Sequence, residues 1–427
     1  MPVFNLTDAS DDKHGSGGKD TINGLGGQDR LFGDAGNDSI SGGDDNDNLF
    51  GQDGNDILNG GDGDDYSEGE AGDDTINGGE GDDGVGYYSA GDGVNVNLKT
   101  GTVSDGQGGT DKLSGIEEIY ASSFADVIIS DNAGPDSYRY FDAGAGDDTI
   151  TGGTGYDIAG YFDNFTDANS PLRIGIVADL VKGTVRDGFG DTDHIKNIEE
   201  IEGTRFSDVF IGNGQDNVFR PFFGSDLING GAGEDRVNYA GDFHVAVRSG
   251  IAVRSVGINA DLDLGRVIDL EGRIDKVTNI EDVTGSRLGD EIRGNAVANV
   301  LEGIQGDDFL AGRGGSDELI GANGNDHILG GVGNDTIAGG AGDNALHGGA
   351  GADRFVIELS DDYDTIRDFK NGADKIDVRA FDFASGGAVK ALAEQHGSSV
   401  VIELNNDTTI ELQNTTLSQI LAGDFLV

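Results

Sequence analysis

The sequence contains no cysteine and no tryptophan, and it has one methionine and four prolines among its 427 residues. Without cysteine the chain can form neither disulfides nor cysteine-based zinc sites, which suits an extracellular protein stabilised by other means. The first ten residues show no basic segment followed by an apolar run, so we expect no Sec signal peptide. No segment approaches the roughly 18 consecutive apolar residues of a transmembrane helix, so we expect none.

Basic residues are scarce: 27 lysines and arginines face 80 acidic residues, which gives a formal net charge of -53. So negative a surface disfavours nucleic acid as a partner. High charge, 76 glycines and 35% hydrophobic residues together predict a disordered chain unless the acids are neutralised. The alternative is that the acids form a solubilising or halophilic surface. Their fixed positions in a repeat favour metal binding instead.

An aspartate recurs every nine residues from Asp20 to Asp83, inside a glycine-rich turn that a mostly aliphatic residue follows. The unit reads Gly-Gly-x-Gly-x-Asp-x-U-x, where U is the aliphatic position. Glycine allows turn conformations that are closed to other residues, so the turn exposes backbone carbonyls beside one carboxylate. Calcium, which takes about six to eight oxygens at roughly 2.3 to 2.6 Å, fits this set better than magnesium. We therefore expect calcium binding and folding to be one event.

This unit resembles the calcium-binding nonapeptide of RTX proteins. The resemblance implies an all-β fold, a right-handed parallel β-roll or β-helix solenoid whose aliphatic residues stack into a thin core. It also implies several Ca²⁺ ions bound at the turns. Asn344 interrupts the series, and we expect weak calcium binding there. The expected metal ligands are Asp20, Asp29, Asp38, Asp47, Asp56, Asp65, Asp74, Asp83, Asp148, Asp157, Asp226, Asp235, Asp308, Asp317, Asp326, Asp335 and Asp353.

A second, longer period organises the middle of the chain. Gly101-Thr102-Val103 recurs in related form at residues 183–185 and 265–267, each step being 82 residues. Alternating, β-branched segments between these points predict strands. The predicted organisation is an N-terminal lead (1–14), a calcium β-roll (15–86), three 82-residue-period β-helix units with degenerate turns (87–302), a second calcium β-roll (303–356) and a C-terminal cap with a secretion signal (357–427).

The C-terminal segment resembles the cap of serralysin-type RTX proteins, with a short helix expected at 388–396 and two strands around residues 405–406. A solenoid needs such a cap. The last four residues, an aspartate followed by three hydrophobic residues, resemble the uncleaved signal of type I secretion substrates. This implies an ABC-transporter apparatus as a partner and an extracellular or cell-surface location outside a Gram-negative cell.

The central units depart from the repeat where Arg139 and Arg220 occupy equivalent places flanked by aromatic residues. Arginine pairs with carboxylates and aromatic faces stack on sugars, so we expect this face to bind an acidic extracellular polysaccharide. The alternative is that the aromatics fill a wider core and the arginines satisfy nearby acids. The expected substrate contacts are Tyr138, Arg139, Tyr140, Tyr156, Tyr161, Arg220 and Phe222.

The sequence leaves open whether the protein is an enzyme. The His-Glu-x-x-His motif of serralysin proteases and the Gly-x-Ser-x-Gly motif of the secreted lipases are absent. An exopolysaccharide depolymerase, either a glycanase or a lyase, and a non-enzymatic adhesin or matrix component remain as alternatives. The Glu117-Glu118 pair recurs as Glu199-Glu200 and as Glu281-Asp282 in the next two 82-residue units, which favours a structural or calcium role. Candidate catalytic residues for a depolymerase are Asp142, Asp163, Tyr138, Arg139 and Arg220.

Overall fold

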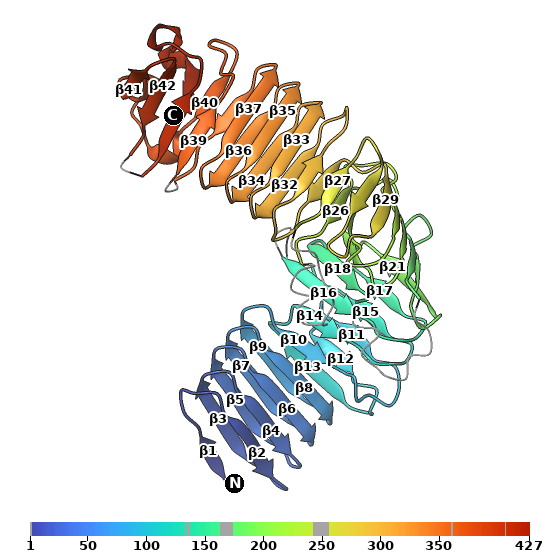
Figure 1. The fold of residues 1–427 in the computed structure, drawn as a ribbon. Coiled ribbons are helices and arrows are strands. Elements are labelled where there is room, and N and C mark those ends of the chain that lie inside the picture. The colour runs from blue at the N-terminus through green and yellow to red at the C-terminus, as the bar shows by residue number, and fades with distance from the viewer. Residues whose placement is uncertain are drawn as a thin grey trace. The chain divides into compact units, whose positions relative to one another are not determined.

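The computed structural model describes residues 2–132, 134, 137–162, 174–241, 256–359, 362–405 and 407–427. It is an all-β protein built from parallel sheets, as predicted, and it divides into two compact units, residues 1–204 and 205–427 (Figure 1). The unit boundary falls inside the predicted segment 87–302. The sequence also predicts extra loops in the central units at residues 162–175 and 241–257, and these lie largely outside the described residues.

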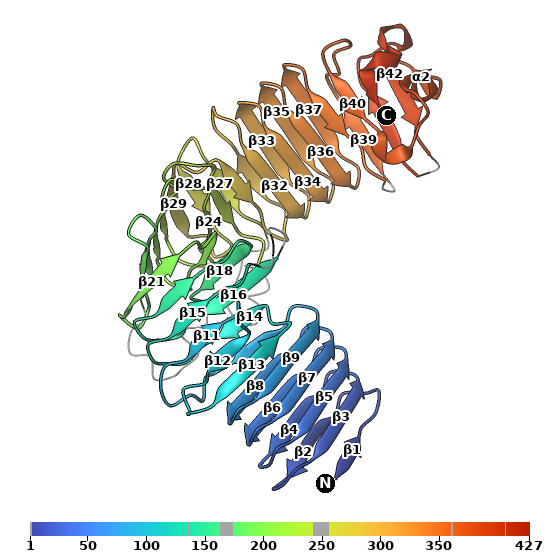
Figure 2. The same cartoon turned by 180° about the vertical axis from the view of Figure 1, so that it is seen from behind.

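In each unit the chain alternates between two sheets, so that a strand pairs in parallel with the strand one coil later (Figures 1 and 2). Sheet A of unit 1 contains β1 (Val3–Asn5), β3 (Thr21–Gly26), β5 (Ser39–Asp44), β7 (Ile57–Asp62), β9 (Thr75–Glu80), β11 (Asn95–Asn97), β12 (Thr102–Ser104), β13 (Thr110–Ser114), β15 (Val127–Ile129), β17 (Thr149–Thr151), β19 (Val177–Asp179), β20 (Thr184–Arg186) and β21 (Thr192–Lys196). Sheet B of unit 1 contains β2 (Asp12–Ser16), β4 (Arg30–Asp34), β6 (Asn48–Asp53), β8 (Tyr66–Ala71), β10 (Gly84–Gly86), β14 (Glu118–Tyr120), β16 (Tyr138–Asp142), β18 (Tyr156–Gly160) and β22 (Glu200–Glu202).

Unit 2 repeats the two-sheet arrangement. Its sheet A contains β23 (Val209–Ile211), β25 (Leu227–Asn229), β27 (Asn259–Asp261), β28 (Arg266–Ile268), β29 (Ile274–Thr278), β31 (Glu291–Arg293), β33 (Phe309–Gly314), β35 (His327–Val332), β37 (Ala345–Ala350), β39 (Tyr363–Ile366), β41 (Ala393–His396), β42 (Ser399–Glu403) and β43 (Thr409–Leu412). Its sheet B contains β24 (Val218–Arg220), β26 (Arg236–Asn238), β30 (Asp282–Thr284), β32 (Val300–Gln305), β34 (Glu318–Asn323), β36 (Thr336–Ala341), β38 (Arg354–Val356), β40 (Lys375–Asp377) and β44 (Phe425–Leu426).

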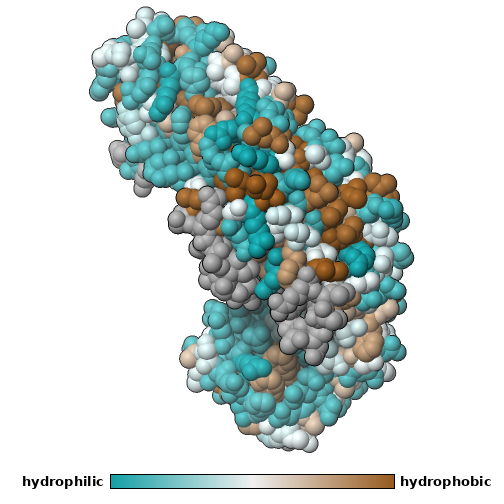
Figure 3. All heavy atoms as spheres, turned by 45° about the vertical axis from the view of Figure 1, so that its right-hand side comes forward, coloured by the Kyte–Doolittle hydropathy of each residue, from teal (hydrophilic) through white to brown (hydrophobic). Residues whose placement is uncertain are grey.

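The nine-residue period sets the register. Since two nonapeptides make one coil, equivalent positions pair 18 residues apart, and Ile22, Ile40, Leu58 and Ile76 form one column in sheet A. These side chains are at most 1% exposed, so each aliphatic residue is buried against the coil before and after it. Burial of these aliphatic side chains away from water is the hydrophobic contribution to the stability of the coils. On the face seen in Figure 3 the surface is predominantly hydrophilic.

The 82-residue units add an antiparallel meander to the parallel coils. In the first unit β11, β12 and β13 pair antiparallel in chain order, and β13 then returns to pair in parallel with β9. The sets β19 to β21 and β27 to β29 pair in the same way. The sequence had predicted strands here within a wider β-helix. The antiparallel order is a new feature, which arises because a short glycine-containing loop connects β12 to β13 and allows only a hairpin.

The C-terminal segment differs in part from the prediction. The helix α2 spans Gly386–Lys390, and residues 393–396 form the strand β41 rather than the second half of a predicted helix. β41 pairs antiparallel with β42, and this pairing satisfies backbone groups that a helix would have bonded internally. The two strands predicted around residues 405–406 are present as the β42–β43 hairpin. Among its described residues the segment also contains the short 3-10 helices η1 (Arg379–Phe381), η2 (Leu417–Gln419) and η3 (Ala422–Asp424).

Candidate calcium sites and an aromatic row

The turn aspartates form two ladders of hydrogen bonds, one along each edge of the N-terminal coils. On one edge the backbone N–H of Asp20 donates to Asp38 Oδ1 (2.6 Å), and Asp38 donates in the same way to Asp56 (2.7 Å). On the other edge Asp29 donates to Asp47 (2.8 Å). Each carboxylate is therefore fixed in position by the turn one coil before it.

The second oxygen of these carboxylates has a different environment. Every one of the 17 predicted ligands is at most 4% exposed. In the part of the chain that the structure describes, all of them except Asp157 carry one buried carboxylate oxygen without a hydrogen-bond partner. An unpaired buried carboxylate is costly, so this oxygen calls for a cation. The donor set therefore fits calcium.

Backbone carbonyls line the same turns. Gly36 and Gly54 have φ values of 141° and 142°, and a Cβ built on Gly54 would collide with the carbonyl oxygen of Gly36. Only glycine allows this close approach of successive turns. Among the described residues, no group of three acidic or histidine side chains has the geometry of a metal site. Carbonyl oxygens must therefore supply part of each coordination shell, as calcium allows.

Burial changes the acidity of the turn aspartates. Desolvation raises the pKa of Asp56, Asp65 and Asp74 to about 7, and neighbouring turn aspartates add to the rise. In unit 2 burial raises the pKa of Asp308 to about 8. Without a cation the folded turns thus favour protonated carboxyls. A bound calcium ion would offset the charge and favour the carboxylates.

Two predicted positions differ from this pattern. Both oxygens of Asp157 accept hydrogen bonds, one from Ser130 Oγ (2.6 Å) and one from the backbone N–H of Gly153 (2.7 Å), so this carboxylate has no oxygen left unpaired. At Asn344 the side-chain amide donates to the carbonyls of Gly340 (3.2 Å) and Gly342 (3.0 Å). The amide satisfies carbonyls that a cation would otherwise contact.

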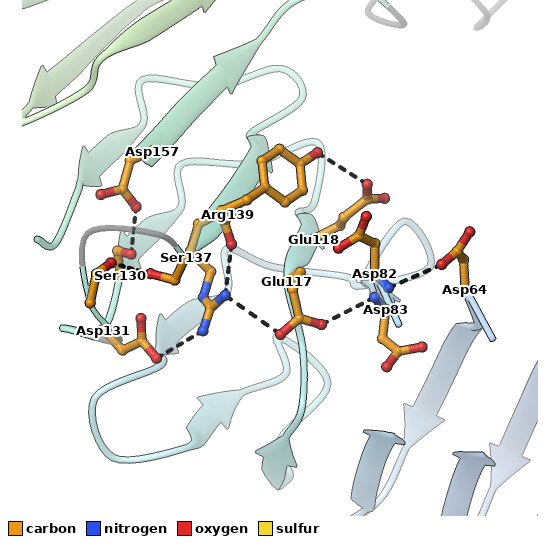
Figure 4. Close-up of polar contacts among 12 residues, drawn as sticks. Asp64, Asp82, Asp83, Glu117, Glu118, Ser130, Asp131, Ser137, Arg139 and Asp157 are labelled. Atoms are coloured by element: carbon orange, nitrogen blue, oxygen red, sulfur yellow. Dashed lines mark hydrogen bonds and ion pairs between the residues drawn. The ribbon is translucent and has the colours of Figure 1, made fainter. Parts of the chain in front are cut away.

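The recurrent glutamates continue the ladder where the coils change. Glu117 Oε2 accepts the backbone N–H of Asp83 (3.1 Å), as Figure 4 shows. Glu199 and Glu281 accept from Asp157 and Asp235 in the same way (both 3.0 Å). The structural role predicted for this pair of acids therefore applies to its first member.

Arg139 is held by acids of the protein itself. Its guanidinium pairs with Asp131 (3.0 Å) and Glu117 (3.5 Å), and it also donates to the carbonyl of Tyr138 (2.6 Å) (Figure 4). Its side chain is 11% exposed. The alternative in which the arginine satisfies nearby acids describes this site. Arg220 lies in unit 2, with its guanidinium 6.0 Å from the centre of the Phe222 ring.

Several predicted substrate residues are in the core. Tyr161 is 1% exposed and Phe222 is 3% exposed, so the prediction that they contact a substrate is corrected. The reason is that these aromatics fill the wider interior of the central coils. Asp142 is also buried, and it accepts a hydrogen bond from the backbone N–H of Gly144 (3.0 Å). Asp163 lies outside the described residues.

The other predicted tyrosines are half-buried on sheet B of unit 1. The hydroxyl of Tyr138 donates to Glu118 (3.2 Å), and that of Tyr156 donates to Glu200 (2.7 Å). Tyr140 lies one coil from Tyr120, with ring centres 6.0 Å apart. These side chains belong to a larger aromatic feature that the sequence pattern did not predict, and one of its rings, Phe32, is buried (8% exposed).

That feature is a row of six rings across sheet B, here called the aromatic row. Successive ring centres are 4.2, 4.8, 6.4, 5.9 and 6.0 Å apart. The first three rings are spaced 18 residues apart in the sequence, but they occupy the final x of the nonapeptide formula, a position at which the formula specifies no residue type. The row consists of His14, Phe32, Phe50, Tyr66, Tyr120 and Tyr140.

Charged side chains flank the aromatic row. The exposed Arg30 lies with its guanidinium 4.8 Å from the centre of Phe32 and 5.5 Å from that of Phe50. Further along, Glu68 accepts from the Tyr66 hydroxyl (2.7 Å) and Glu118 from the Tyr120 hydroxyl (2.6 Å). Burial, and after it these carboxylates, raise the pKa of Tyr66 and Tyr120, so both stay neutral donors.

Comparisons with known proteins agree with the repeat chemistry. The family model described as RTX calcium-binding nonapeptide repeat (4 copies) matches within residues 14–85, 140–159, 223–242 and 284–355. A comparison with curated proteins found no match. Among solved structures the chain is similar to the extracellular lipase LipA from Serratia marcescens, with 17% identity and a TM-score of 0.21 over 64% of this chain and 45% of that one.

The chain thus spans less than half of the lipase's length. In the part of the chain that the structure describes, no helix is both long and apolar enough to cross a membrane. The aspartate ladders and the family match lead to one conclusion. The chain carries RTX calcium-binding nonapeptide repeats arranged as a parallel β-solenoid, and its cofactor is calcium, bound in multiple copies.

Proposed function

We propose that this protein is a secreted, calcium-folded RTX protein that binds an extended acidic polysaccharide along the aromatic row. The observation that carries this proposal is the row itself: six rings that follow one another across sheet B of unit 1, with the ring-free strand β10 between Tyr66 and Tyr120. A periodic sheet presents side chains at regular intervals, which suits a polymer with a regular repeat.

The chemistry of the row fits sugar rings. The rings of His14, Phe32 and Phe50 stack face to face on one another, so this part of the row offers apolar ring edges to a sugar chain, and the tyrosine hydroxyls further along offer polar contacts. Arg30 is exposed and lies beside Phe32 and Phe50, where it can pair with a sugar carboxylate. The arginine contact thus moves from Arg139 and Arg220, the predicted contacts, to Arg30.

The net charge of -53 opposes a polyanion at long range. Calcium reduces this opposition because each bound ion removes two negative charges. A chain that is exported and then folds on binding calcium is stabilised by the ions, so it does not need the disulfides that other extracellular proteins use. We propose export by a type I ABC-transporter apparatus, supported by the C-terminal residues 424–427 and by the repeats themselves.

The depolymerase alternative draws support from Glu118, whose carboxylate accepts hydroxyl hydrogen bonds from both Tyr120 (2.6 Å) and Tyr138 (3.2 Å). A glutamate beside tyrosines at a sugar-binding surface could serve in acid-base chemistry. Binding without cleavage, as in an adhesin or matrix component, needs only the row.

The test is binding of the calcium-loaded chain to a panel of acidic and neutral polysaccharides by affinity electrophoresis. We expect Phe50→Ala with Tyr120→Ala to reduce affinity for the bound polymer by at least tenfold, because two ring platforms are lost. Phe124→Ala, at an exposed ring outside the row, is the matched control and should leave affinity unchanged.

Arg30→Ala should weaken binding to acidic polymers and not to neutral ones. Retained binding in the double variant, or no binding to any acidic polymer, would contradict the proposal. New reducing ends, or an ultraviolet-absorbing unsaturated product, would establish the hydrolase or the lyase alternative respectively. Glu118→Gln should then abolish that product while binding persists.

A further inference from the structure

The hairpin loops of the first two 82-residue units contain buried carboxylates that the nonapeptide pattern does not include. Asp105 precedes the β12–β13 loop and Asp111 lies in β13; Asp187 and Asp193 occupy the same places in the second unit. All four are completely buried, with 0% exposure. They lie outside the ranges that match the RTX repeat.

The first loop takes the place of the next calcium turn. The backbone N–H of Asp74 donates to Asp111 Oδ1 (3.0 Å), just as Asp56 donates to Asp74 (2.7 Å). A Cβ built on Gly72 would collide with the carbonyl of Gly54, and one built on Gly109 would collide with the carbonyl of Gly72. The loop therefore stacks on the last regular turn as that turn stacks on its predecessor.

Asp105 adds a carboxylate that regular turns lack. Its Oδ1 accepts three N–H groups from residues 107 to 109, at 2.9, 3.0 and 2.8 Å. These bonds explain one oxygen as a cap of the loop. They leave Oδ2 buried and, within the described part of the chain, without a hydrogen-bond partner.

The free oxygen of Asp105 borders the stacked turn. A Cβ built on Gly109 would lie 2.7 Å from Asp105 Oδ2 and would also meet the Gly72 carbonyl oxygen. Within the described residues, Oδ2 of Asp74 and Oδ2 of Asp111 likewise have no hydrogen-bond partner. Three carboxylates and a carbonyl thus surround one buried region, and a capping role for Asp105 does not account for the three unpaired oxygens.

The second unit repeats the arrangement. Asp187 Oδ1 accepts N–H groups from residues 189 to 191 (3.0, 2.8 and 2.8 Å), and Asp148 donates to Asp193 Oδ1 (3.1 Å). Within the described ranges, Oδ2 of Asp148, Asp187 and Asp193 has no hydrogen-bond partner. In the third unit the hydroxyl of Tyr239 already donates to Asp275 Oδ2 (2.9 Å), so we restrict the inference to the first two.

We propose that each of the first two hairpin loops completes a calcium site with the last regular turn before it. Asp74, Asp105, Asp111 and the Gly72 carbonyl are ligands of the first site, and Asp148, Asp187 and Asp193 of the second. Among the described residues, no group of three acidic side chains has the geometry of a metal site by itself. Further carbonyl or water oxygens therefore complete the coordination shell of each ion. The ion would tie each inserted meander to the regular coils.

The test is the number of calcium ions per full-length chain, measured by equilibrium dialysis with atomic absorption. Asp105→Asn and Asp187→Asn keep the Oδ1 acceptor and remove the charge, and each should lower the count by one ion or weaken one site at least tenfold. Asp92→Asn, at an exposed acid of the same unit, is the matched control and should change neither. An unchanged count and unchanged affinity in both variants would overturn the proposal, even if their thermal stability fell.

A second readout does not depend on stability. Tyr87 and Tyr161 lie next to Asp111 and Asp193, but within the described part of the chain neither hydroxyl makes a hydrogen bond of the kind that Tyr239 makes to Asp275. The chain has no tryptophan. Terbium substituted for calcium at the proposed sites should therefore emit after tyrosine excitation. Tyr87→Phe with Tyr161→Phe should reduce this emission, whereas Tyr88→Phe, at a 54% exposed ring, should not. Equal emission from the double variant and the control would overturn the proposal.

Discussion

At the scale of single residues, calcium binding at a turn depends on whether the turn position carries a carboxylate or an amide. The turn aspartates fix one oxygen in a backbone ladder and leave the other for a cation. Asn344 instead uses its amide to hold the carbonyls of Gly340 and Gly342. One atom thus separates a calcium turn from a turn closed by the protein itself.

This comparison predicts a gain of function. Asn344→Asp removes the amide donor and adds a charge, so the turn should acquire a calcium ion. The count per chain should rise by one in equilibrium dialysis, and thermal stability in calcium should rise. Asn325→Asp, at an exposed asparagine one residue before the turn aspartate Asp326, is a control that should leave the count unchanged. An unchanged count in Asn344→Asp would contradict this account of the turn.

The pKa of the turn aspartates predicts how pH acts on the ion-free chain. Burial raises the pKa of Asp56, Asp65 and Asp74 to about 7, above the value of about 3.9 in an unfolded chain. Their contribution to folding is therefore full below pH 3.9 and is lost as pH rises towards 7. In chelator, the β-signal in circular dichroism should be larger at pH 5.5 than at pH 7.5. A signal that rises with pH would contradict this assignment.

The positions of the turn aspartates could be predicted from sequence because each repeat states them independently. The burial of the Tyr161 and Phe222 side chains in the core could not be predicted from the sequence. Both lie where the repeat is interrupted, and without a regular period no pattern says which side of the backbone faces the core. The aromatic row was not predicted because its first three rings occupy a repeat position that accepts any residue, and the other three rings do not share that position.

At the scale of elements, Glu117, Glu199 and Glu281 join the regular coils to the inserted units. Each accepts the N–H of a turn aspartate that would otherwise have lost its acceptor when the next coil starts late. In a regular coil this N–H is accepted by the turn aspartate one coil later. At the junction the longer glutamate side chain reaches the same N–H from a position where no turn aspartate is present. A buried N–H without an acceptor is costly.

Removing this acceptor should destabilise the junction. Glu117→Ala should lower the free energy of unfolding in calcium by about 1.5 to 3 kcal/mol, the range for a hydrogen bond to a charged group. Glu117→Gln, which keeps an oxygen acceptor, should lose less. Glu80→Ala, at an exposed glutamate, should change stability by less than about 0.5 kcal/mol. Equal losses in denaturant melts of Glu117→Ala and Glu80→Ala would contradict the junction role.

Strand existence was predictable in this region, but strand direction was not. Alternation in residues 94–98 indicates a strand, and β11 is present there. Whether it pairs with a parallel neighbour from another coil or an antiparallel one from its own hairpin depends on the loop. The cap posed the same difficulty, because residues 393–396 pair with β42 across the two-residue turn 397–398, and this turn decides between a hairpin and a longer helix.

At the scale of the whole molecule, the charge and the thin core make folding depend on the metal. The chain has 80 acidic residues, and in the absence of calcium the turns place carboxylates one above another in buried columns. One aliphatic side chain per nonapeptide buries too little area to offset that repulsion. Binding only to the folded state shifts the equilibrium towards folding in proportion to the logarithm of free calcium.

Calcium-coupled folding is therefore the central claim, and far-ultraviolet circular dichroism of the full chain at pH 7.5 tests it most directly. In excess chelator we predict a disordered spectrum, and on addition of millimolar calcium a β-sheet spectrum that chelator reverses. Magnesium at the same concentration should not restore the β-signal, because it demands a smaller octahedral shell. A full β-sheet spectrum in excess chelator would contradict the account.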